Sequence, residues 1–577
     1  MRKTGWVLKR FWMHTLCFVL IGCGGSDSSV GGDSSGSGSS DATPDDFVFV
    51  DQSDVALGEV ITSNTVSITG INTSASISVT DGEYSIDGGA FTSAAGTINN
   101  NQTVAVRHTS SASINTSTNT TLSVGNVSDT FTSTTADAAG MTGSWSEPEV
   151  LDDLSNNADV PNIAVDGAGN VWAVWSQFRD APSGRSIFAR RLDNATGLWG
   201  NISTLDDEME SYAFPRLAVN DAGEALVTWN DPNSPGIGTT NTAIWYNGYE
   251  PNTGWAGSEV ISGGTSSSIG SPHVALDDTG KGIFVWSQWD GTRVSVRSRI
   301  YQFGGGWTPT LGNGATWLEP DTNNGTSRFA KVILNEVGNA LVVWEQDAGP
   351  TSSFEVKRFF ATTDTWEMGQ SELESVANTG EPDLIEYANG SILVAWAEMG
   401  NNGLESIAYS GDLTTFSAVA NVEQGSGAAF LPKLATNSLG TVVAAWQQVP
   451  NGGSFFQVFV SEYDAGLNSW SPAEMVSDES MGSGLAPKIV IDHAGTITVV
   501  WENEFGANNR RLMYSRRPDG GDWSAPQNLE ASVNQAGAVG ATALAIDDDG
   551  NITLVWQQRD GLGAADPYNL WVRRFEL

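Results

Sequence analysis

Basic residues recur at one position of a repeated segment in this 577-residue chain. Five of the eight copies carry a cation there: Arg216, His273, Lys331, Lys433 and Lys488. The other copies have Asn162, Asp383 and Ala543, with Thr542 beside it. The chain has only 27 Lys and Arg against 67 Asp and Glu, so this enrichment is informative. Gathered at the mouth of a channel, such cations would form a positive collar that concentrates an anionic ligand. The alternative is that each cation binds a loop or an acidic residue of a neighbouring repeat.

A second set of polar residues follows a tryptophan by two positions in every copy. Five copies have glutamine there: Gln177, Gln288, Gln346, Gln448 and Gln558. The others have Asp231, Glu398 and Asn503. Amides can recognise sugar hydroxyls, so these residues are candidate ligand contacts. Such regularity also predicts a structural hydrogen bond that closes the following turn.

Both sets belong to a seventeen-residue segment that occurs eight times between Pro161 and Gln558. One copy reads PNIAVDGAGNVWAVWSQ and another reads PKIVIDHAGTITVVWEN. The shared tryptophans are 50 to 58 residues apart, and such a period indicates one repeated supersecondary unit. They are Trp175, Trp229, Trp286, Trp344, Trp396, Trp446, Trp501 and Trp556, and we expect them in the core.

Each repeat predicts four antiparallel strands. Its first half alternates, as in IAVD, and its second half is β-branched and aromatic, as in VWAVW. The D/N-x-x-G between them, as in Asp166 to Gly169, predicts a tight hairpin. A third strand ends in a basic or aromatic cluster, such as FARRL near Arg190, and a fourth carries W-S-x-P, as at Trp145. Four such strands make one blade of a β-propeller.

The order of these segments predicts how the ring closes. The chain ends at Leu577 on a third strand, and a spare fourth-strand segment, GSWSEPEVL from Gly143, precedes the first copy. Pairing the two would leave no sheet edge bare. We therefore predict an all-β fold, with an eight-bladed propeller over residues 143–577 closed by an N-terminal strand. An open solenoid of eight hairpin pairs and a seven-blade ring with one divergent copy are the alternatives.

The repeats resemble the sialidase-like group of propellers, whose Asp-box turns read Ser-x-Asp-x-Gly-x-x-Trp. The D/N-x-x-G turn departs from that box, because the Ser is missing and the Gly is shifted by one position. The resemblance implies a propeller of this general kind. Sialidase chemistry would need an arginine triad, a Tyr–Glu nucleophile pair and an acid/base residue, and only Phe214-Pro215-Arg216 partly matches the Arg-bearing motif. We predict no catalytic residue.

The first 45 residues predict export and anchoring. Residues 1–22 combine four Lys and Arg with the apolar run FWMHTLCFVLIG, as in a signal peptide. Leu20-Ile21-Gly22-Cys23 resembles the lipobox of bacterial lipoproteins, which implies that Cys23 becomes the lipidated first residue. Residues 23–45 then form a flexible Gly/Ser/Asp tether. Because Gly24 is not the Asp of inner-membrane retention, we expect the outer membrane, on either its periplasmic or its cell-surface side.

Residues 46–136 predict a smaller domain. Alternating Thr, Ser and Val in TVSITG, SASISV, TVAVRH and TLSVG indicate about seven short strands, as in an immunoglobulin-like sandwich. The segment also resembles repeats of bacterial surface proteins, which implies a spacer or an adhesive module.

Charge and metal-ligand spacing limit the partners. Without the four cations of the signal, 23 Lys and Arg face 67 Asp and Glu, and a net charge near −44 opposes nucleic acid and anionic membranes. Acids at turns such as Asp547 to Asp549 lack the ligand spacing of a dedicated calcium loop. His108, His273 and His493 are too dispersed for a metal site. We predict no metal and no cofactor, with calcium as a weak alternative.

The predicted geometry places function on one face. The tight D/N-x-x-G turns occupy one end of each blade, whereas longer loops such as FRDAPSGRS and LDDEMESYAF gather at the other end, where binding usually occurs. We predict a lipid-anchored envelope protein whose propeller binds a glycan or another surface macromolecule. A glycoside hydrolase or polysaccharide lyase, and a structural envelope component, are the alternatives.

Overall fold

The computed structural model describes residues 40–55, 58–111, 116–135, 143–153, 156–179, 184–206, 214–231, 242–262, 269–308, 315–319, 325–347, 352–369, 371–376, 381–398, 403–423, 427–505, 510–530, 539–559 and 567–577. The expected signal peptide, Cys23 and most of the tether lie outside these residues and stay predictions. Within the described residues, no helix has the length and apolar character needed to cross a membrane.

In the described residues between Gln52 and Thr135, nine strands form two sheets, where the sequence predicted about seven strands. One sheet has the order β1 (Gln52–Val55), β9 (Val127–Thr135), β8 (Ser117–Val124), β4 (Ala75–Thr80), β6 (Gly96–Ile98). The other joins β2 (Val60–Thr62), β7 (Thr103–Thr109), β3 (Val66–Ser67) and β5 (Glu83–Ile86). Side chains alternate between buried and accessible along β8, as expected for a strand with one face in a core. The immunoglobulin-like assignment stays a prediction.

The repeats form eight antiparallel sheets, which we number 1 to 8 in chain order. Sheet 1 consists of β12 (Ala158–Val165), β13 (Val171–Arg179), β14 (Gly184–Asp193), β15 (Leu198–Trp199) and β16 (Ser203–Thr204), and sheet 2 of β17 (Arg216–Val219), β18 (Ala225–Asp231), β19 (Ala243–Glu250), β20 (Gly254–Trp255) and β21 (Glu259–Val260). Sheet 3 consists of β22 (Ile269–Leu276), β23 (Lys281–Trp289), β24 (Val294–Gln302), β25 (Gly306–Thr308) and β26 (Thr316–Trp317). Sheet 4 consists of β27 (Thr326–Leu334), β28 (Ala340–Asp347), β29 (Ser352–Phe360), β30 (Thr365–Trp366) and β31 (Ser371–Val376).

Sheets 5 to 8 follow the same plan. Sheet 5 consists of β32 (Asp383–Tyr387), β33 (Ser391–Glu398), β34 (Gly403–Tyr409) and β35 (Ala420–Asn421), and sheet 6 of β36 (Ala429–Thr436), β37 (Val442–Gln448), β38 (Gln457–Asp464), β39 (Ser469–Trp470) and β40 (Glu474–Met475). Sheet 7 consists of β41 (Ser483–Ile491), β42 (Ile497–Glu504), β43 (Arg510–Arg517) and β44 (Gln527–Asn528). Sheet 8 consists of β45 (Val539–Ile546), β46 (Ile552–Arg559) and β47 (Tyr568–Glu576), with β10 (Ser144–Trp145) and β11 (Glu149–Val150). The described part of the chain also has short 3-10 helices at Ala388–Gly390 and Glu479–Met481.

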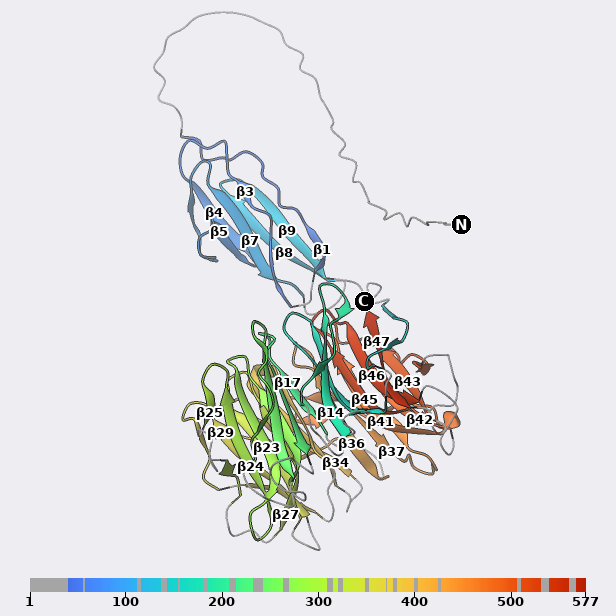
Figure 1. The fold of residues 1–577 in the computed structure, drawn as a ribbon. Coiled ribbons are helices and arrows are strands. Elements are labelled where there is room, and N and C mark those ends of the chain that lie inside the picture. The colour runs from blue at the N-terminus through green and yellow to red at the C-terminus, as the bar shows by residue number, and fades with distance from the viewer. Residues whose placement is uncertain are drawn as a thin grey trace, which may run out of the picture. The chain divides into compact units, whose positions relative to one another are not determined.

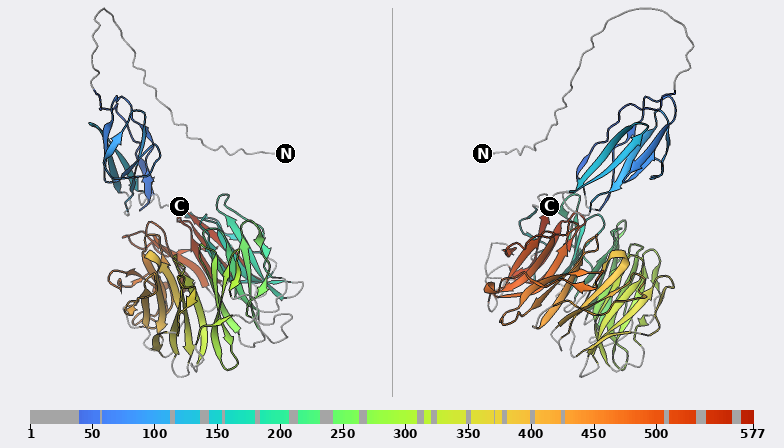
Figure 2. Two further views of the ribbon diagram at one scale, coloured as in Figure 1. Left: turned by 90° about the vertical axis from the view of Figure 1, so that its left-hand side faces the viewer. Right: turned by 180° about the vertical axis from the view of Figure 1, so that it is seen from behind.

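The eight sheets are arranged in a ring. The first strand of each sheet contacts the first strand of the next, and β12 contacts β45, so the first and last sheets are neighbours (Figure 1). Figure 2 shows the sheets following one another in sequence order, from teal through green and yellow to red. The eight repeated tryptophans fill the space between sheets, each with at most 1% of its surface exposed. This all-β ring with its innermost first strands is the arrangement of a β-propeller.

The segment that precedes the first repeat pairs with the last strand of the chain. Ser144 lies opposite Glu576 and Trp145 opposite Phe575 in β47, and Glu149 lies opposite Val572. Leu151 of this segment has no exposed surface. The last sheet is therefore completed from the other end of the repeat region, as its order predicted.

The D/N-x-x-G turns form as expected. In seven repeats the glycine N–H donates to the carbonyl of the Asx residue, as Gly550 N–H does to Asp547 at 3.0 Å. The Asx side chain also accepts the N–H of the residue after the glycine, as Asp547 Oδ1 does from Asn551 at 2.8 Å. Gly550 has φ 82°, which a residue with a side chain rarely adopts.

One kind of contact between blades was not predicted from the sequence. Polar residues of the third strand donate to a carbonyl just beyond the fourth strand of the preceding blade. Lys357 Nζ donates to the carbonyl of Leu318 at 2.7 Å, Arg573 Nη1 to Leu529 at 2.8 Å, and Arg190 Nη1 to Leu151 at 3.0 Å. The basic clusters of the third strands thus tie consecutive blades together.

Candidate functional site

A bulge precedes the repeated cation position in most first strands. The register shifts between β12 and β13, β22 and β23, β27 and β28, β36 and β37, β41 and β42, and β45 and β46. Positive φ occurs there at Val160, Phe329, Leu431, Ala486 and Ala541, between 44° and 55°. Each of these first strands starts before the bulge, so the residue at the repeated position lies inside its strand. A bulge redirects side chains, and positive φ outside glycine is strained, so the backbone is specialised here.

Three residues at the repeated position connect neighbouring first strands. Asn162 Oδ1 accepts the N–H of Leu217 at 3.2 Å, and His273 Nδ1 accepts that of Val332 at 3.5 Å. Asp383 Oδ2 accepts the N–H of Leu434 at 2.9 Å. These acceptors stand in sheets 1, 3 and 5, so they alternate with the cations of sheets 2, 4 and 6.

Two of the cations have acidic partners. Lys331 Nζ lies 3.1 Å from Glu381 Oε1 and 3.4 Å from Asp383 Oδ1, and Lys433 Nζ lies 3.6 Å from the same Asp383 oxygen. Among the described residues, Arg216 and Lys488 form no ion pair and no hydrogen bond through their side chains. The acidic-partner interpretation therefore fits Lys331 and Lys433.

The protonation states leave a positive net charge on the group formed by Glu381 and the residues at the repeated position. Burial, with the nearby charges of Lys331 and Arg216, lowers the pKa of His273 to about 3, so its ring is neutral. Burial and Lys433 lower the pKa of Lys488 to about 8, which keeps it mostly protonated at pH 7. Burial would raise the pKa of Glu381, but Lys331 and Lys433 outweigh it and lower that pKa to about 2. The lysines at positions 331 and 433 also lower the pKa of Asp383 against the effect of its burial.

Charge therefore does not balance at this position. Four cations, Arg216, Lys331, Lys433 and Lys488, face the carboxylates Glu381 and Asp383, which leaves two positive charges. Glu502 also acts on Lys488, but it is paired with Arg510 at 3.0 Å and so does not change this excess. These two positive charges occur in a chain whose formal net charge is −40. A positive centre in an acidic protein attracts anions selectively to that point.

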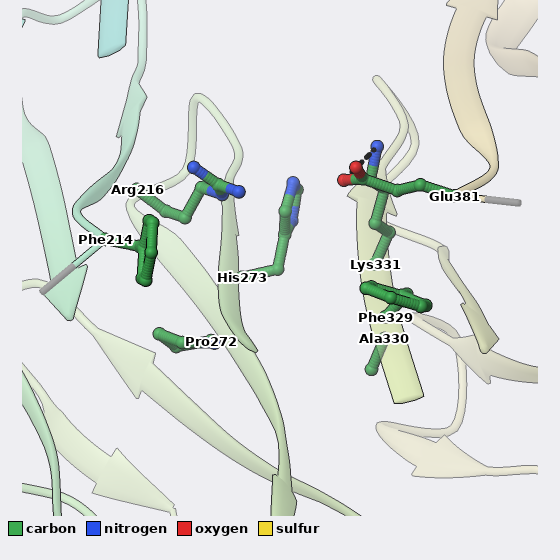
Figure 3. A pocket seen from close by; sticks show the side chains of 8 residues that line it. All are labelled: Phe214, Arg216, Pro272, His273, Phe329, Ala330, Lys331 and Glu381. Atoms are coloured by element: carbon green, nitrogen blue, oxygen red, sulfur yellow. Dashed lines mark ion pairs between the residues drawn. The ribbon is translucent and has the colours of Figure 1, made fainter. Parts of the chain in front are cut away.

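A cavity of about 190 Å³ lies beside these residues, and we call it the inner pocket. Its lining consists of Phe214, Arg216, Pro272, His273, Phe329, Ala330, Lys331 and Glu381. Figure 3 shows His273 between Arg216 and Phe214 on one side and Lys331, Glu381 and Phe329 on the other. Three of the five predicted cationic residues thus share one pocket. The contributions of Phe214, Phe329 and Glu381 were missed, although each directly precedes the first residue of its repeat.

The five glutamines lie elsewhere, inside the blades. Each is at most 5% exposed. The indole N–H groups of Trp175, Trp286, Trp446 and Trp556 donate to the amide oxygen two residues on, each at 2.9 Å, and Trp344 does so at 3.4 Å. The amide of Gln448 also donates to Glu423 at 2.6 Å. These side chains hold the tryptophan and the end of its strand, and their proposed ligand contacts stay predictions.

Other sequence predictions fall partly outside the described residues. Of the long loops, 180–183, 207–213, 232–241 and 320–324 lie outside them. Among the residues that the structure does describe, no three His, Cys, Asp or Glu side chains gather as a metal site would require.

Asp206 is a buried carboxylate near one of these loops. It is 7% exposed, and both its oxygens accept the N–H of Ile187 at 3.3 Å. Burial raises its pKa to about 7, and Asp231 adds to the effect. Because the pKa is higher in the folded than in the unfolded chain, this group contributes stability below about pH 4 that is lost as the pH rises towards 7.

We therefore expect Asp206→Asn to melt at a higher temperature than the wild type at pH 8, and the difference to shrink towards pH 4. Asparagine keeps an acceptor for Ile187 but cannot ionise, and the change in the free energy of unfolding is at most about 4 kcal/mol. Thermal melting of both proteins between pH 4 and pH 8 measures it. Ser262 accepts the N–H of Ile244 at the matching place in sheet 2, so Ser262→Ala is the control with a pH-independent effect. A constant difference for Asp206→Asn would contradict the assignment.

Comparisons with known proteins found solved structures with low sequence identity and low structural similarity to this chain. No protein family matches the chain by its sequence profile, and no curated protein matches it. The intramolecular trans-sialidase from Ruminococcus gnavus is 13% identical, with a TM-score of 0.34 over 74% of this chain and 95% of that one. The β-propeller domain of the Trilobed protease from Pyrococcus furiosus is 11% identical, with a TM-score of 0.37 over 65% and 97%. An α-L-arabinanase from Penicillium chrysogenum is 12% identical, with a TM-score of 0.34 over 53% and 92%. We infer neither an activity nor a substrate from these similarities.

Proposed function

We propose that this chain is a binding protein whose eight-bladed propeller holds an anionic group of its ligand in the inner pocket. The observation that carries the proposal is the excess of positive charge at the repeated position, together with Arg216, which lines the pocket and forms no ion pair among the described residues. An anion bound at this position would satisfy those charges, and charge-assisted hydrogen bonds are among the stronger polar contacts. The ligand is a glycan or another surface macromolecule that carries such a group.

The same proposal includes the setting that the sequence predicts. A signal peptide over residues 1–22, a lipid on Cys23 and a tether over 23–45 would place the protein in the outer membrane. The sheets between Gln52 and Thr135 would then be an immunoglobulin-like spacer or adhesive module.

Binding fits the inner pocket better than hydrolysis does. Glycoside hydrolysis uses two carboxyl groups, one on each side of the scissile bond. Glu381 is the single carboxylate that lines the pocket among the described residues, and it is held by Lys331 at 3.1 Å. Its pKa of about 2 makes it a poor acid or base at neutral pH.

Titration calorimetry of the full-length protein at low ionic strength tests the proposal. The probes are polygalacturonate, a small carboxylate such as 3-phenylpropionate, and neutral galactan. We expect at least one anionic probe to bind and neutral galactan not to bind. The variant Arg216→Gln should weaken anion binding about 10- to 100-fold, as expected for one lost charge-assisted contact.

The control variant removes a cation far from the pocket in the same fold. Lys281 pairs with Asp364 at 3.1 Å next to the D/N-x-x-G turn of sheet 3. Lys281→Gln should bind anions as the wild type does. Equal binding of neutral and anionic probes, or equal anion affinity of Arg216→Gln and Lys281→Gln, would remove the proposal.

A further inference from the structure

The lining of the inner pocket combines apolar surface with hydrogen-bond donors. Phe214, Pro272, Phe329 and Ala330 supply the apolar part. Arg216 and Lys331 supply N–H donors. Since Nδ1 of the neutral His273 ring accepts the N–H of Val332, its proton is on Nε2, which is a further donor. The lining therefore has three donor side chains and a single acceptor side chain, Glu381.

That acceptor is already engaged. Glu381 Oε1 forms an ion pair with Lys331 at 3.1 Å, so the side chains of the lining offer a ligand more donors than acceptors. A sugar hydroxyl both donates and accepts, and a hydroxyl buried without an acceptor for its proton costs free energy. An ionised carboxylate only accepts, so it matches a set of donors without that cost.

The apolar residues are placed to cover a ligand body. Phe214 is 47% exposed and Phe329 is 40% exposed, and they lie on opposite sides of His273 (Figure 3). Phe329 is held on the bulge at φ 51°, a conformation that costs free energy for an aromatic residue. Leu431, at the matching bulge of sheet 6, has φ 55° and is 39% exposed. Strained backbone that keeps apolar side chains in solvent indicates a role in binding.

From these observations we propose that the inner pocket takes a carboxylate carried on an apolar body, with the carboxylate at Arg216 and His273 and the body between Phe214 and Phe329. This inference rests on the proposed function and names the chemistry of the group that enters. The pocket, at about 190 Å³, is smaller than the roughly 300–1,000 Å³ of pockets for drug-sized ligands. It therefore admits one ring or one branched side chain. Both a free aryl acid and the carboxyl-terminal residue of a protein have this chemistry.

Calorimetric titration of the full-length protein with three acids tests the inference. 3-Phenylpropionate represents a free aryl acid, N-acetylphenylalanine a chain end, and galacturonate a sugar acid of the same charge. We expect one or both of the aryl acids to bind at least about tenfold more tightly than galacturonate, since each covers phenyl surface that the sugar does not. Tighter binding of N-acetylphenylalanine would assign the chain end, and tighter binding of 3-phenylpropionate the free acid.

The decisive variant is Phe329→Asn, because asparagine suits positive φ and removes the ring without straining the bulge. It should melt no lower than the wild type, lose about tenfold in affinity for the aryl acids and keep its affinity for acetate. Arg216→Gln should weaken the binding of every acid. Galacturonate binding as tight as that of the aryl acids, or unchanged aryl-acid affinity in Phe329→Asn, would overturn the inference and leave the proposed function standing. Binding of none of these acids and no binding of polygalacturonate would overturn both.

Discussion

Trp344→Ala is expected to lower the free energy of unfolding by about 3–5 kcal/mol, the usual cost of deleting a fully buried tryptophan. Trp344 has no exposed surface and packs between sheets 3 and 4 with Val285, Leu318 and Val342. Its indole N–H also donates to Gln346 at 3.4 Å, so the variant leaves a buried amide without this partner. Urea unfolding followed by tryptophan fluorescence and by circular dichroism measures the loss.

Trp289→Ala is the matched control. Trp289 ends the corresponding strand of sheet 3 but is 42% exposed. Removing it should change the free energy of unfolding by less than about 1 kcal/mol, because little buried surface is lost. If the two variants unfolded at the same urea concentration, the repeated tryptophans would not be the core contacts between blades.

Local sequence patterns were sufficient to predict the turns and the core tryptophans of the repeats. The turn from Asp547 to Gly550 needs only an Asx acceptor and a glycine within four residues, and both are visible in the sequence. Trp556 is equally predictable, since a tryptophan inside a continuous β-branched run is expected in the core, and β46 is buried from Ile552 to Trp556. These features depend on residues that are close in sequence.

Contacts between blades could not be predicted in the same way. Lys357 and Leu318 are 39 positions apart, and nothing in either segment specifies the other. The pairing of Lys331 with Asp383 spans 52 positions and depends on which first strands become neighbours in the ring. The repeat identified the cationic position and Asp383 within it, but the pairing of Asp383 and Glu381 with the lysines could be seen only in the fold. The bulges were also missed, because their positive-φ positions hold valine, phenylalanine, leucine and alanine, none of which is a residue type that favours this conformation.

Removing the segment that closes the ring is expected to have the largest effect on folding. A chain beginning at residue 156 lacks β10 and β11, so β47 is left as an unpaired edge. It also loses the buried Leu151 and the contacts of Trp145 with Tyr514 and Phe575, whose ring centroids lie 5.6 and 5.5 Å away. One buried leucine and one tryptophan together contribute about 5 kcal/mol or more. We expect a large fall in melting temperature, with aggregation through the bare edge.

A chain beginning at residue 143 is the matched control, because it lacks the same upstream residues and keeps both closing strands. Its repeat region should melt as it does in the full-length protein. A synthetic peptide of residues 143–153 should restore the shorter chain in a concentration-dependent way, since a ligand that binds only the folded state stabilises it. The buried carboxylate of Asp152 accepts the N–H of Leu570 at 3.0 Å. A peptide with Asp152→Ala loses this hydrogen bond, so it should restore the melting temperature less than the unchanged peptide does. Equal melting of the chains that begin at 143 and 156 would show that the ring holds without this closure, because the first strands β12 and β45 would then be sufficient to join sheet 1 to sheet 8.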